Sequence, residues 1–235
     1  MKKFDITKMN NENKPILITG ANGFIGQELC KYLWHKNYAI TECSYNLDDI
    51  ENIQKLFEAN KPDIVIHLAA KLDKFKKGRE KDDFFQVNVI GTLNIVRLCQ
   101  KYNVKLIYFS TSSVKYSKTK YGNKYRISKL LAENLIECFT KNQGLKAVTI
   151  RPSAIYKTVN GKTLDRFGKE EDVTKGEWYS MSNLFILIES IIAEDDFEKY
   201  MVYKTKMLRH YFYNTKALFG RAFKKLCSIF SYNQI

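Results

Sequence analysis

The chain has 235 residues, of which 45% are hydrophobic, enough to bury one substantial core. Its formal net charge is +14, from 39 basic and 25 acidic residues. Such an excess could attract nucleic acid, an anionic membrane or a phosphorylated substrate, or could simply form a lysine-rich solvated surface. No nucleic-acid-binding signature accompanies the charge, so we expect no nucleic-acid partner. No apolar run reaches the roughly 18 residues needed to span a membrane.

Cysteine and histidine usage argues against a disulfide framework or a zinc site. Five cysteines stand singly, without a Cys-x-x-Cys pair, beside only three histidines. We therefore expect no metal and interpret the cysteines as core thiols in a reducing cytoplasm. Residues 1–14 form a polar leader without the apolar core of a signal peptide, which also favours a cytoplasmic location.

Apolar runs and helical spacings alternate from residue 15 to residue 156. This strand–helix alternation is typical of an α/β fold with a doubly wound parallel sheet, the Rossmann fold. We expect strands at 15–20, 38–44, 62–70, 105–113 and 146–156, and helices at 24–37, 48–60, 84–103 and 125–142.

The regular pattern ends beyond residue 156. Residues 157–177 are polar and loop-like, residues 178–181 favour a strand, and residues 182–195 favour a helix. The tail, residues 196–235, has eight basic and two acidic residues, and we expect a basic amphipathic helix in it. That helix could pack on the protein's own core or on a partner, or could lie on an anionic membrane.

Three glycines stand between the first expected strand and the first expected helix. In "GANGFIG" they are Gly20, Gly23 and Gly26. A tight turn, a close approach to a pyrophosphate and a helix N-terminus aimed at the phosphates all require small residues at this place. The spacing alone is weak evidence, but its position after the first strand is strong evidence for dinucleotide binding.

A tyrosine and a lysine four residues apart, Tyr125 and Lys129, begin the helix expected at 125–142. This spacing puts both side chains on one helical face. The same spacing also occurs elsewhere in the chain, at Tyr32/Lys36, Tyr116/Lys120 and Tyr200/Lys204. The pair therefore needs support from its place among the other motifs.

Six stretches in chain order give that support, and together they resemble the extended short-chain dehydrogenase/reductase family of nucleotide-sugar epimerases, reductases and dehydratases. The stretches cover roughly residues 15 to 156 and are "ITGANGFIG", "NLDDIENIQKLF", "PDIVIHLAA", "VNVIGTLNIV", "YFSTSSV" with "YRISKLLAE", and "IRPSAIY". The resemblance implies a Rossmann domain at 15–156, NAD or NADP as cofactor, and a shortened C-terminal substrate lobe at 157–195.

The resemblance also implies catalytic roles. Tyr125 would be the acid/base, and a nearby ammonium and the cofactor's charge would lower the pKa of its phenol from about 10. Lys129 would in addition bind the cofactor's ribose. Thr111 would hydrogen-bond the reacting oxygen, with Ser110 and Ser112 as near alternatives because a one-residue shift changes the strand face.

Further residues would contact the cofactor if the resemblance holds. Asn88 either reaches the cofactor or fixes the local backbone, and His67 is interpreted as a packed strand residue. The remaining cofactor-contact residues are Gly20, Gly23, Phe24, Ile25 and Gly26 at the pyrophosphate, Asn46 and Leu47 at the adenine, and Leu68, Ala69, Ala70 and Pro152 near the ribose and nicotinamide.

The chain departs from the family at several places. Asn46 stands where an aspartate is usual, and only Glu42 or Ser44 could meet the adenosine ribose, so NAD and NADP both remain open. Ser112 and Ser113 replace the acidic pair of the 4,6-dehydratases, which disfavours dehydration. The loop between Thr111 and Tyr125 and the C-terminal lobe are both shorter than usual.

Three functions compete on this evidence. The first is an NAD(P)-dependent epimerase or reductase acting on a nucleotide-linked sugar in polysaccharide assembly, as a homodimer by analogy with relatives. The second is a catalytically reduced relative that binds a dinucleotide as a sensor or scaffold. The third, nucleic-acid binding through the positive charge, ranks last.

Overall fold

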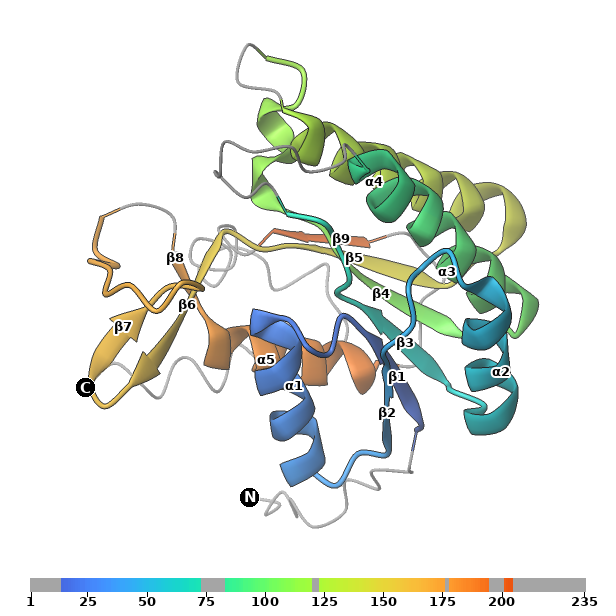
Figure 1. The fold of residues 1–235 in the computed structure, drawn as a ribbon, viewed down its shortest axis with the longest axis horizontal. Helices are drawn as coiled ribbons and strands as arrows, with labels where there is room; N and C mark the ends of the chain where they lie inside the picture. The colour runs from blue at the N-terminus through green and yellow to red at the C-terminus, as the bar shows by residue number, and fades with distance from the viewer. Residues whose placement is uncertain (1–13, 73–82, 120–122, 176–177, 195–200, 205–235) are drawn as a thin grey trace, which may run out of the picture.

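The computed structural model describes residues 14–72, 83–119, 123–175, 178–194 and 201–204 (Figure 1). A parallel sheet occupies its centre, and helices cover both faces of that sheet. A smaller sheet, formed by a later part of the chain, lies to one side of the central sheet. The expected α/β architecture is therefore confirmed.

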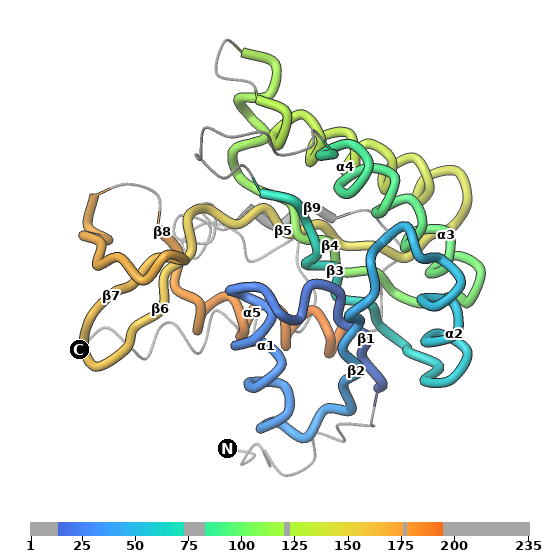
Figure 2. The backbone as a smooth tube through the Cα atoms, in the orientation of Figure 1, coloured from blue at the N-terminus to red at the C-terminus, as the bar shows by residue number. Residues whose placement is uncertain are grey.

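The central sheet has six strands in the order β2-β1-β3-β4-β5-β9, and every neighbouring pair is parallel. Figure 2 follows the backbone from β1, in blue, to β5, in yellow. The strands are β1 (Ile16–Thr19), β2 (Ile40–Cys43), β3 (Ile64–His67), β4 (Lys105–Phe109), β5 (Ala147–Arg151) and β9 (Met201–Lys204).

Five α-helices divide between the two faces of this sheet. Helices α1 and α5 share one apolar core with the strands, and α2, α3 and α4 share the other (Figure 1). A π-helical turn, η2 (Gln86–Ile90), leads directly into α3, and a 3-10 helix, η3 (Ser112–Tyr116), follows β4. The α-helices are α1 (Phe24–His35), α2 (Ile50–Asn60), α3 (Gly91–Lys101), α4 (Lys124–Gln143) and α5 (Met181–Ile192).

Strands β1 and β3 form the middle of the core. All four residues of each strand are buried, as a parallel sheet covered on both faces requires, and this explains their continuous apolar sequences. The chain leaves β1 toward β2 on one side and later returns to β3 on the other side. Such a change of direction opens a crevice at the carboxyl ends of the two strands, next to Thr19 and His67.

Residues 157–175 contain more regular structure than the sequence predicted. The strand expected at 146–156 ends at Arg151, and a new strand, β6 (Ala154–Val159), begins after Pro152 and continues past the expected domain boundary at residue 156. It forms an antiparallel hairpin with β7 (Lys162–Leu164) through a turn in which Gly161 has φ +76°. The loop prediction was wrong here because the polar side chains of this hairpin face solvent, which hides the alternation of a strand.

Strand β8 (Trp178–Ser180) completes the small sheet by pairing in parallel with β6. This confirms the strand expected at 178–181, and α5 confirms the helix expected at 182–195. The strands of the small sheet are in the order β7-β6-β8. Its first strand, β6, begins three residues after the end of β5 (Figure 1).

The segment expected as a helical tail begins differently. Residues 201–204 form β9, which pairs in parallel with β5 and covers what would otherwise be an open edge strand. The amphipathic helix expected farther along the tail lies outside the described residues.

Two further expectations can be compared with the described part of the chain. No helix in it is long and apolar enough to cross a membrane. Cys30, Cys43 and Cys99 are buried free thiols, as expected, whereas Cys138 is exposed on α4.

Candidate active site

The turn after β1 is built from glycines that lie against backbone. Gly20 has φ +71°, and a Cβ placed on it would lie 2.6 Å from the Ala69 backbone nitrogen. A Cβ on Gly26 would overlap the Gly20 carbonyl oxygen and lie 2.6 Å from the Ala21 carbonyl oxygen. Both glycines are therefore required by the fold itself.

Gly23 differs from its two neighbours. It is the N-cap of α1, with φ −78° and ψ 171°, and any residue can adopt that conformation. A Cβ on Gly23 would have only the Gly20 carbonyl oxygen within 4 Å, at 3.2 Å. No side chain caps α1 and no acidic residue lies in its first turn. The free N–H groups and the positive end of the helix dipole thus favour an anion beside Gly23.

A cavity of about 460 Å³ opens beside this turn. Nine of the sequence-predicted site residues line it, and they come from α1, from the segments after β3, β4 and β5, and from α4. These residues are Phe24, Ile25, Gly26, Leu68, Ala70, Thr111, Tyr125, Lys129 and Pro152.

Tyr125 lies in the first turn of α4. Asn123 caps this helix by accepting a hydrogen bond from the Arg126 backbone N–H at 2.9 Å. Burial raises the pKa of the Tyr125 phenol above its ordinary value, and the charge of Arg166 and a hydrogen bond from Thr111 oppose that rise. Burial outweighs these two groups, so the environment as a whole favours the neutral phenol.

Lys129 follows one turn later and is only 2% exposed. Its Nζ lies 4.3 Å from the centroid of the Tyr108 ring. Burial lowers the pKa of the Lys129 ammonium to about 7, against the influence of Glu133, which raises it. A lysine in this state can either donate or accept a proton near neutral pH.

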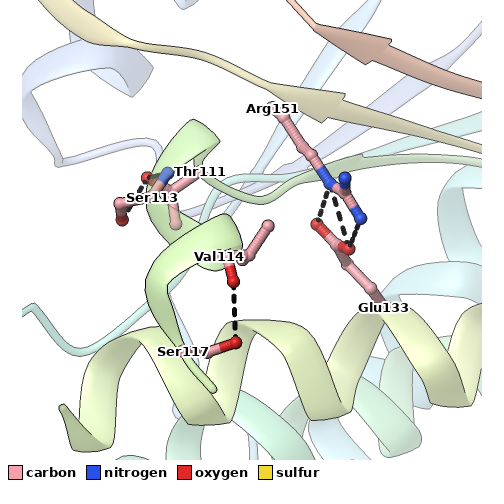
Figure 3. A network of polar contacts seen from close by, with 6 residues as sticks. All are labelled: Thr111, Ser113, Val114, Ser117, Glu133 and Arg151. Carbon is pink, nitrogen blue, oxygen red and sulfur yellow. Dashed lines mark hydrogen bonds and ion pairs between the residues drawn. The ribbon is translucent and has the colours of Figure 1, made fainter. Parts of the chain in front are cut away.

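Thr111 caps the turn η3, and Figure 3 shows its contacts. Its hydroxyl oxygen accepts a hydrogen bond from the Ser113 backbone N–H at 3.2 Å and lies 3.0 Å from the Ser113 hydroxyl. When the Ser113 hydroxyl donates, Thr111 has its own proton left to donate toward Tyr125. The alternatives Ser110 and Ser112 also line the cavity, so all three hydroxyl-bearing residues stay candidates.

A chain of buried hydrogen bonds connects the glycine turn to this helix. The Thr92 hydroxyl donates to the Asn88 carbonyl at 2.7 Å, so it accepts from the His67 Nε2–H at 3.1 Å. His67 Nδ1 therefore accepts from the Thr19 hydroxyl at 2.6 Å. Burial and the charge of Lys129 lower the pKa of His67 to about 3, so His67 is a neutral packed residue, as expected.

Asn88 continues the chain to α4. Its amide donates to the Ser128 hydroxyl at 2.9 Å, and Ser128 donates to the Tyr125 carbonyl at 2.8 Å. The same Asn88 side chain also bonds both backbone groups of Lys71, at 2.7 and 3.0 Å. Of the two roles considered for Asn88, these contacts favour fixing the backbone.

The other predicted residues are not among those that line the cavity. The Ala69 backbone N–H donates to the Thr19 hydroxyl at 3.3 Å. Asn46 is exposed after β2. Leu47 is buried, and its carbonyl accepts a hydrogen bond from the Asn94 amide at 2.8 Å.

The structure adds residues that the sequence analysis missed. Glu133, 2% exposed, forms a bidentate ion pair with Arg151 beside Lys129 (Figure 3). The spacing of Lys129 and Glu133, four residues apart on one helix, was an available signal. Asp165, Arg166 and Trp178 also line the cavity, and no local pattern indicated them because the fold of the small sheet brings them there.

Comparison with known proteins agrees with this geometry. The model of the NAD dependent epimerase/dehydratase family matches residues 16–166. The dTDP-D-glucose 4,6-dehydratase of Dictyostelium discoideum is 28% identical over 63% of this chain and 46% of the relative. The GDP-6-deoxy-D-talose 4-dehydrogenase of Aggregatibacter actinomycetemcomitans is 34% identical over 51% of this chain and 40% of the relative. The chain thus spans about half the length of the curated relatives it matches.

Solved structures share the fold. The dTDP-4-dehydrorhamnose reductase of Bacillus anthracis, in complex with NADP, has a TM-score of 0.64 and 22% identity, covering 82% of this chain and 74% of that one. The UDP-glucose 4-epimerase of Thermotoga maritima, with UDP-glucose, has a TM-score of 0.66 and 21% identity, covering 81% and 76%. At these identities the likeness shows the fold alone.

Two of the glycines form a matched pair for a stability measurement. We expect Gly26→Ser to lower the free energy of unfolding by about 1–3 kcal/mol, because its Cβ must displace backbone atoms. Gly23→Ser should leave the stability nearly unchanged, because serine is a good N-cap and little surrounds its Cβ. Urea denaturation of both variants measures this, and equal losses would contradict the assignment.

The buried ammonium of Lys129 gives a prediction about pH. Because its folded pKa is about 7 against an ordinary 10.5, the unfolded state binds more protons between those values, and stability at this position rises with pH across that window. Lys129→Met should therefore have a higher unfolding free energy than wild type, and this difference should be larger at about pH 7 than at about pH 10. The exposed Lys146→Met is the control, and a pH-independent difference for Lys129→Met would be the contrary result.

Proposed function

Because the chain belongs to the NAD-dependent epimerase/dehydratase family, we propose that it binds NAD or NADP and oxidises or reduces a nucleotide-linked sugar. The observation that carries the proposal is that one cavity of about 460 Å³ is lined by Thr111, Tyr125 and Lys129 together with the first turn of α1. The family is NAD(P)-dependent, which supports the assignment of the cofactor.

The residues beside α1 fit a dinucleotide. The uncapped N-terminus of α1 would receive the pyrophosphate over Gly23, where a side chain would otherwise take that space. Lys129 would donate hydrogen bonds to the ribose from inside the cavity. The other proposed contacts are Gly20, Phe24, Ile25 and Gly26 at the pyrophosphate, Asn46 and Leu47 at the adenine, and Leu68, Ala69, Ala70, Asn88 and Pro152 toward the ribose and nicotinamide.

Tyr125 would move the proton. The bound dinucleotide supplies or accepts the hydride at its nicotinamide. Tyr125 would take a proton from a substrate hydroxyl, or return one to a carbonyl, and Thr111 would hold that oxygen by a hydrogen bond. Thr111 and Tyr125 line the same cavity, so both groups could meet the same substrate oxygen.

Epimerase or reductase chemistry suits the cavity better than dehydration. Elimination of water requires an acid to protonate the leaving hydroxyl. Ser112 and Ser113 line the cavity where the dehydratases carry acids, and Asp165 is the one carboxylate along its described lining. Asp165 Oδ1 accepts hydrogen bonds from the Phe167 and Lys169 backbone N–H groups at 2.8 and 2.9 Å, so that oxygen is occupied within its own turn.

Relatives that act on nucleotide-linked sugars support the substrate class, because their names include epimerases and dehydrogenases of such compounds. A homodimer is proposed by the same analogy, and the exposed Ile127 and Leu131 give α4 an apolar face for it. Membrane contact through the tail stays a prediction, because residues 205–235 lie outside the described part of the chain. The cytoplasmic location is likewise still a prediction.

Tyr125→Phe tests the proposal. Removal of the phenolic hydroxyl should lower kcat by about 10²–10⁴-fold, because proton transfer is lost, while dinucleotide affinity is largely retained. NAD(P)H absorbance, followed with UDP-, GDP- and dTDP-linked sugars, measures turnover, and ligand fluorescence measures affinity.

Tyr116→Phe is the matched control. Tyr116 also has a lysine four residues later in the sequence, but its side chain is 41% exposed outside the cavity lining, so turnover should stay at the wild-type level. Full turnover in Tyr125→Phe would refute the mechanism. Dinucleotide binding without turnover in the wild-type chain would instead favour the catalytically reduced relative.

A further inference from the structure

A lysine of the small sheet lies over the beginning of α1. Lys157 Nζ is 5.7 Å from the centroid of the Phe24 ring and 3.1 Å from Glu28 Oε1. Phe24 is the first residue of α1 and lines the cavity, and Glu28 follows it one turn later. Because residues four apart share one face of a helix, the ammonium stands over the face that these two side chains form.

Strand β6 brings Lys157 to this place. Side chains alternate between the two faces of a strand, so Ile155 and Lys157 lie on the same face of β6. Ile155 lines the cavity and packs against the apolar core to which α1 belongs. The face of β6 that borders the cavity is thus also the face that carries the lysine to α1.

The helix end beside Lys157 offers N–H groups but no cation of its own. Residues 24–27, the first turn of α1, are Phe, Ile, Gly and Gln, and no side chain caps the helix. The pyrophosphate of a dinucleotide carries two negative charges, whereas a helix N-terminus supplies the equivalent of about half an elementary positive charge. An ammonium close to the same turn would neutralise more of that ligand charge.

The pairing of Lys157 with Glu28 can be exchanged at little cost. Their side chains are 34% and 30% exposed, and ion pairs so open to water contribute little to stability. Glu28 Oε1 is also 3.9 Å from Lys31 Nζ on the same helix, so the carboxylate keeps a cation when Lys157 leaves. The flexible four-carbon stem of a lysine allows this movement without a change in the backbone.

We infer that Lys157 is a phosphate-binding residue, which exchanges the Glu28 carboxylate for the pyrophosphate of a dinucleotide over the N-terminus of α1. The inference rests on the proposed function, because it concerns the cofactor site proposed there. Glu28 then competes with the ligand for the same ammonium. The small sheet thereby contributes a charge to the dinucleotide site of the large sheet.

Two variants separate this role from that of a structural clasp between α1 and β6. Lys157→Met and Glu28→Gln each remove the ion pair while keeping the length of the side chain. Lys157→Met should weaken dinucleotide binding by about five- to tenfold, because a charged hydrogen bond to the pyrophosphate is lost. Glu28→Gln should instead tighten binding by about twofold, because the competing carboxylate is lost. A clasp would require both variants to change the affinity in the same direction.

Lys162→Met is the matched control. Lys162 belongs to the same hairpin, and its Nζ pairs with Glu170 at 3.2 Å. This variant changes the net charge as Lys157→Met does, but its dinucleotide affinity should stay within about twofold of wild type, because salt screens distant exposed charges. Lys157→Arg should retain most of the wild-type affinity, since a guanidinium also binds phosphate.

Ligands that share the pyrophosphate locate the contact. Calorimetric titrations of the full chain compare NADH, NADPH and ADP-ribose, which keeps the pyrophosphate but lacks the nicotinamide. Lys157→Met should weaken the binding of all three by the same factor. A loss confined to NADPH would place the lysine at the 2′-phosphate and would overturn the assignment.

The inference is also overturned if Lys157→Met binds these ligands like wild type, or if Glu28→Gln weakens binding as Lys157→Met does. Urea denaturation of each variant should give midpoints close to that of wild type, because the pair is exposed. Wild-type binding that Lys157→Met leaves intact would overturn this inference alone. Failure of the wild-type chain to bind any of the three ligands would overturn the proposed function as well.

Discussion

One buried chain of hydrogen bonds crosses the candidate site from β1 to α4. It runs from Thr19, at the end of β1, through His67, Thr92, Asn88 and Ser128 to the carbonyl of Tyr125. Each of these five side chains is buried and donates a hydrogen bond to the next group in the chain. Shifting one element would therefore leave a buried polar group unpaired, at a cost of about 1–3 kcal/mol. The chain joins the strand before the glycine turn to the helix that carries the tyrosine. The N-terminal turn of α1 and the start of α4 are therefore held in one fixed relation.

Electrostatics within this frame separates the two residues of the Tyr-x-x-x-Lys pair. Lys129 is desolvated between the sheet and α4, and the Glu133–Arg151 ion pair beside it is itself largely buried. Tyr125 lines the same cavity, where burial raises the pKa of its phenol and the charge of Arg166 opposes that rise. Burial therefore favours the neutral form of both side chains, raising the pKa of Tyr125 and lowering that of Lys129.

Local sequence carried most of the information about the large sheet. The apolar runs of β1 and β3, the glycines at 20, 23 and 26, and the Tyr125/Lys129 spacing are all short-range signals, and each predicted its element. The hairpin of β6 and β7 was missed because its exposed polar residues resemble a loop. Arg166 and Trp178 were missed because tertiary packing alone brings them to the cavity. Asn88 could not be assigned from sequence, since only its contacts to Lys71 and Ser128 distinguish its role.

The central claim is that the α1 turn and the cavity beside it form a dinucleotide site, and a fluorescence titration with NADH and NADPH tests it most directly. The account predicts saturable binding of one of these dinucleotides by the wild-type chain, and its loss in Gly23→Leu, whose side chain would fill the space above the helix N-terminus. Addition of UDP-, GDP- or dTDP-linked sugars should tighten binding for the matching compound. Failure of the wild-type chain to bind either dinucleotide, with its fold intact, would contradict the account.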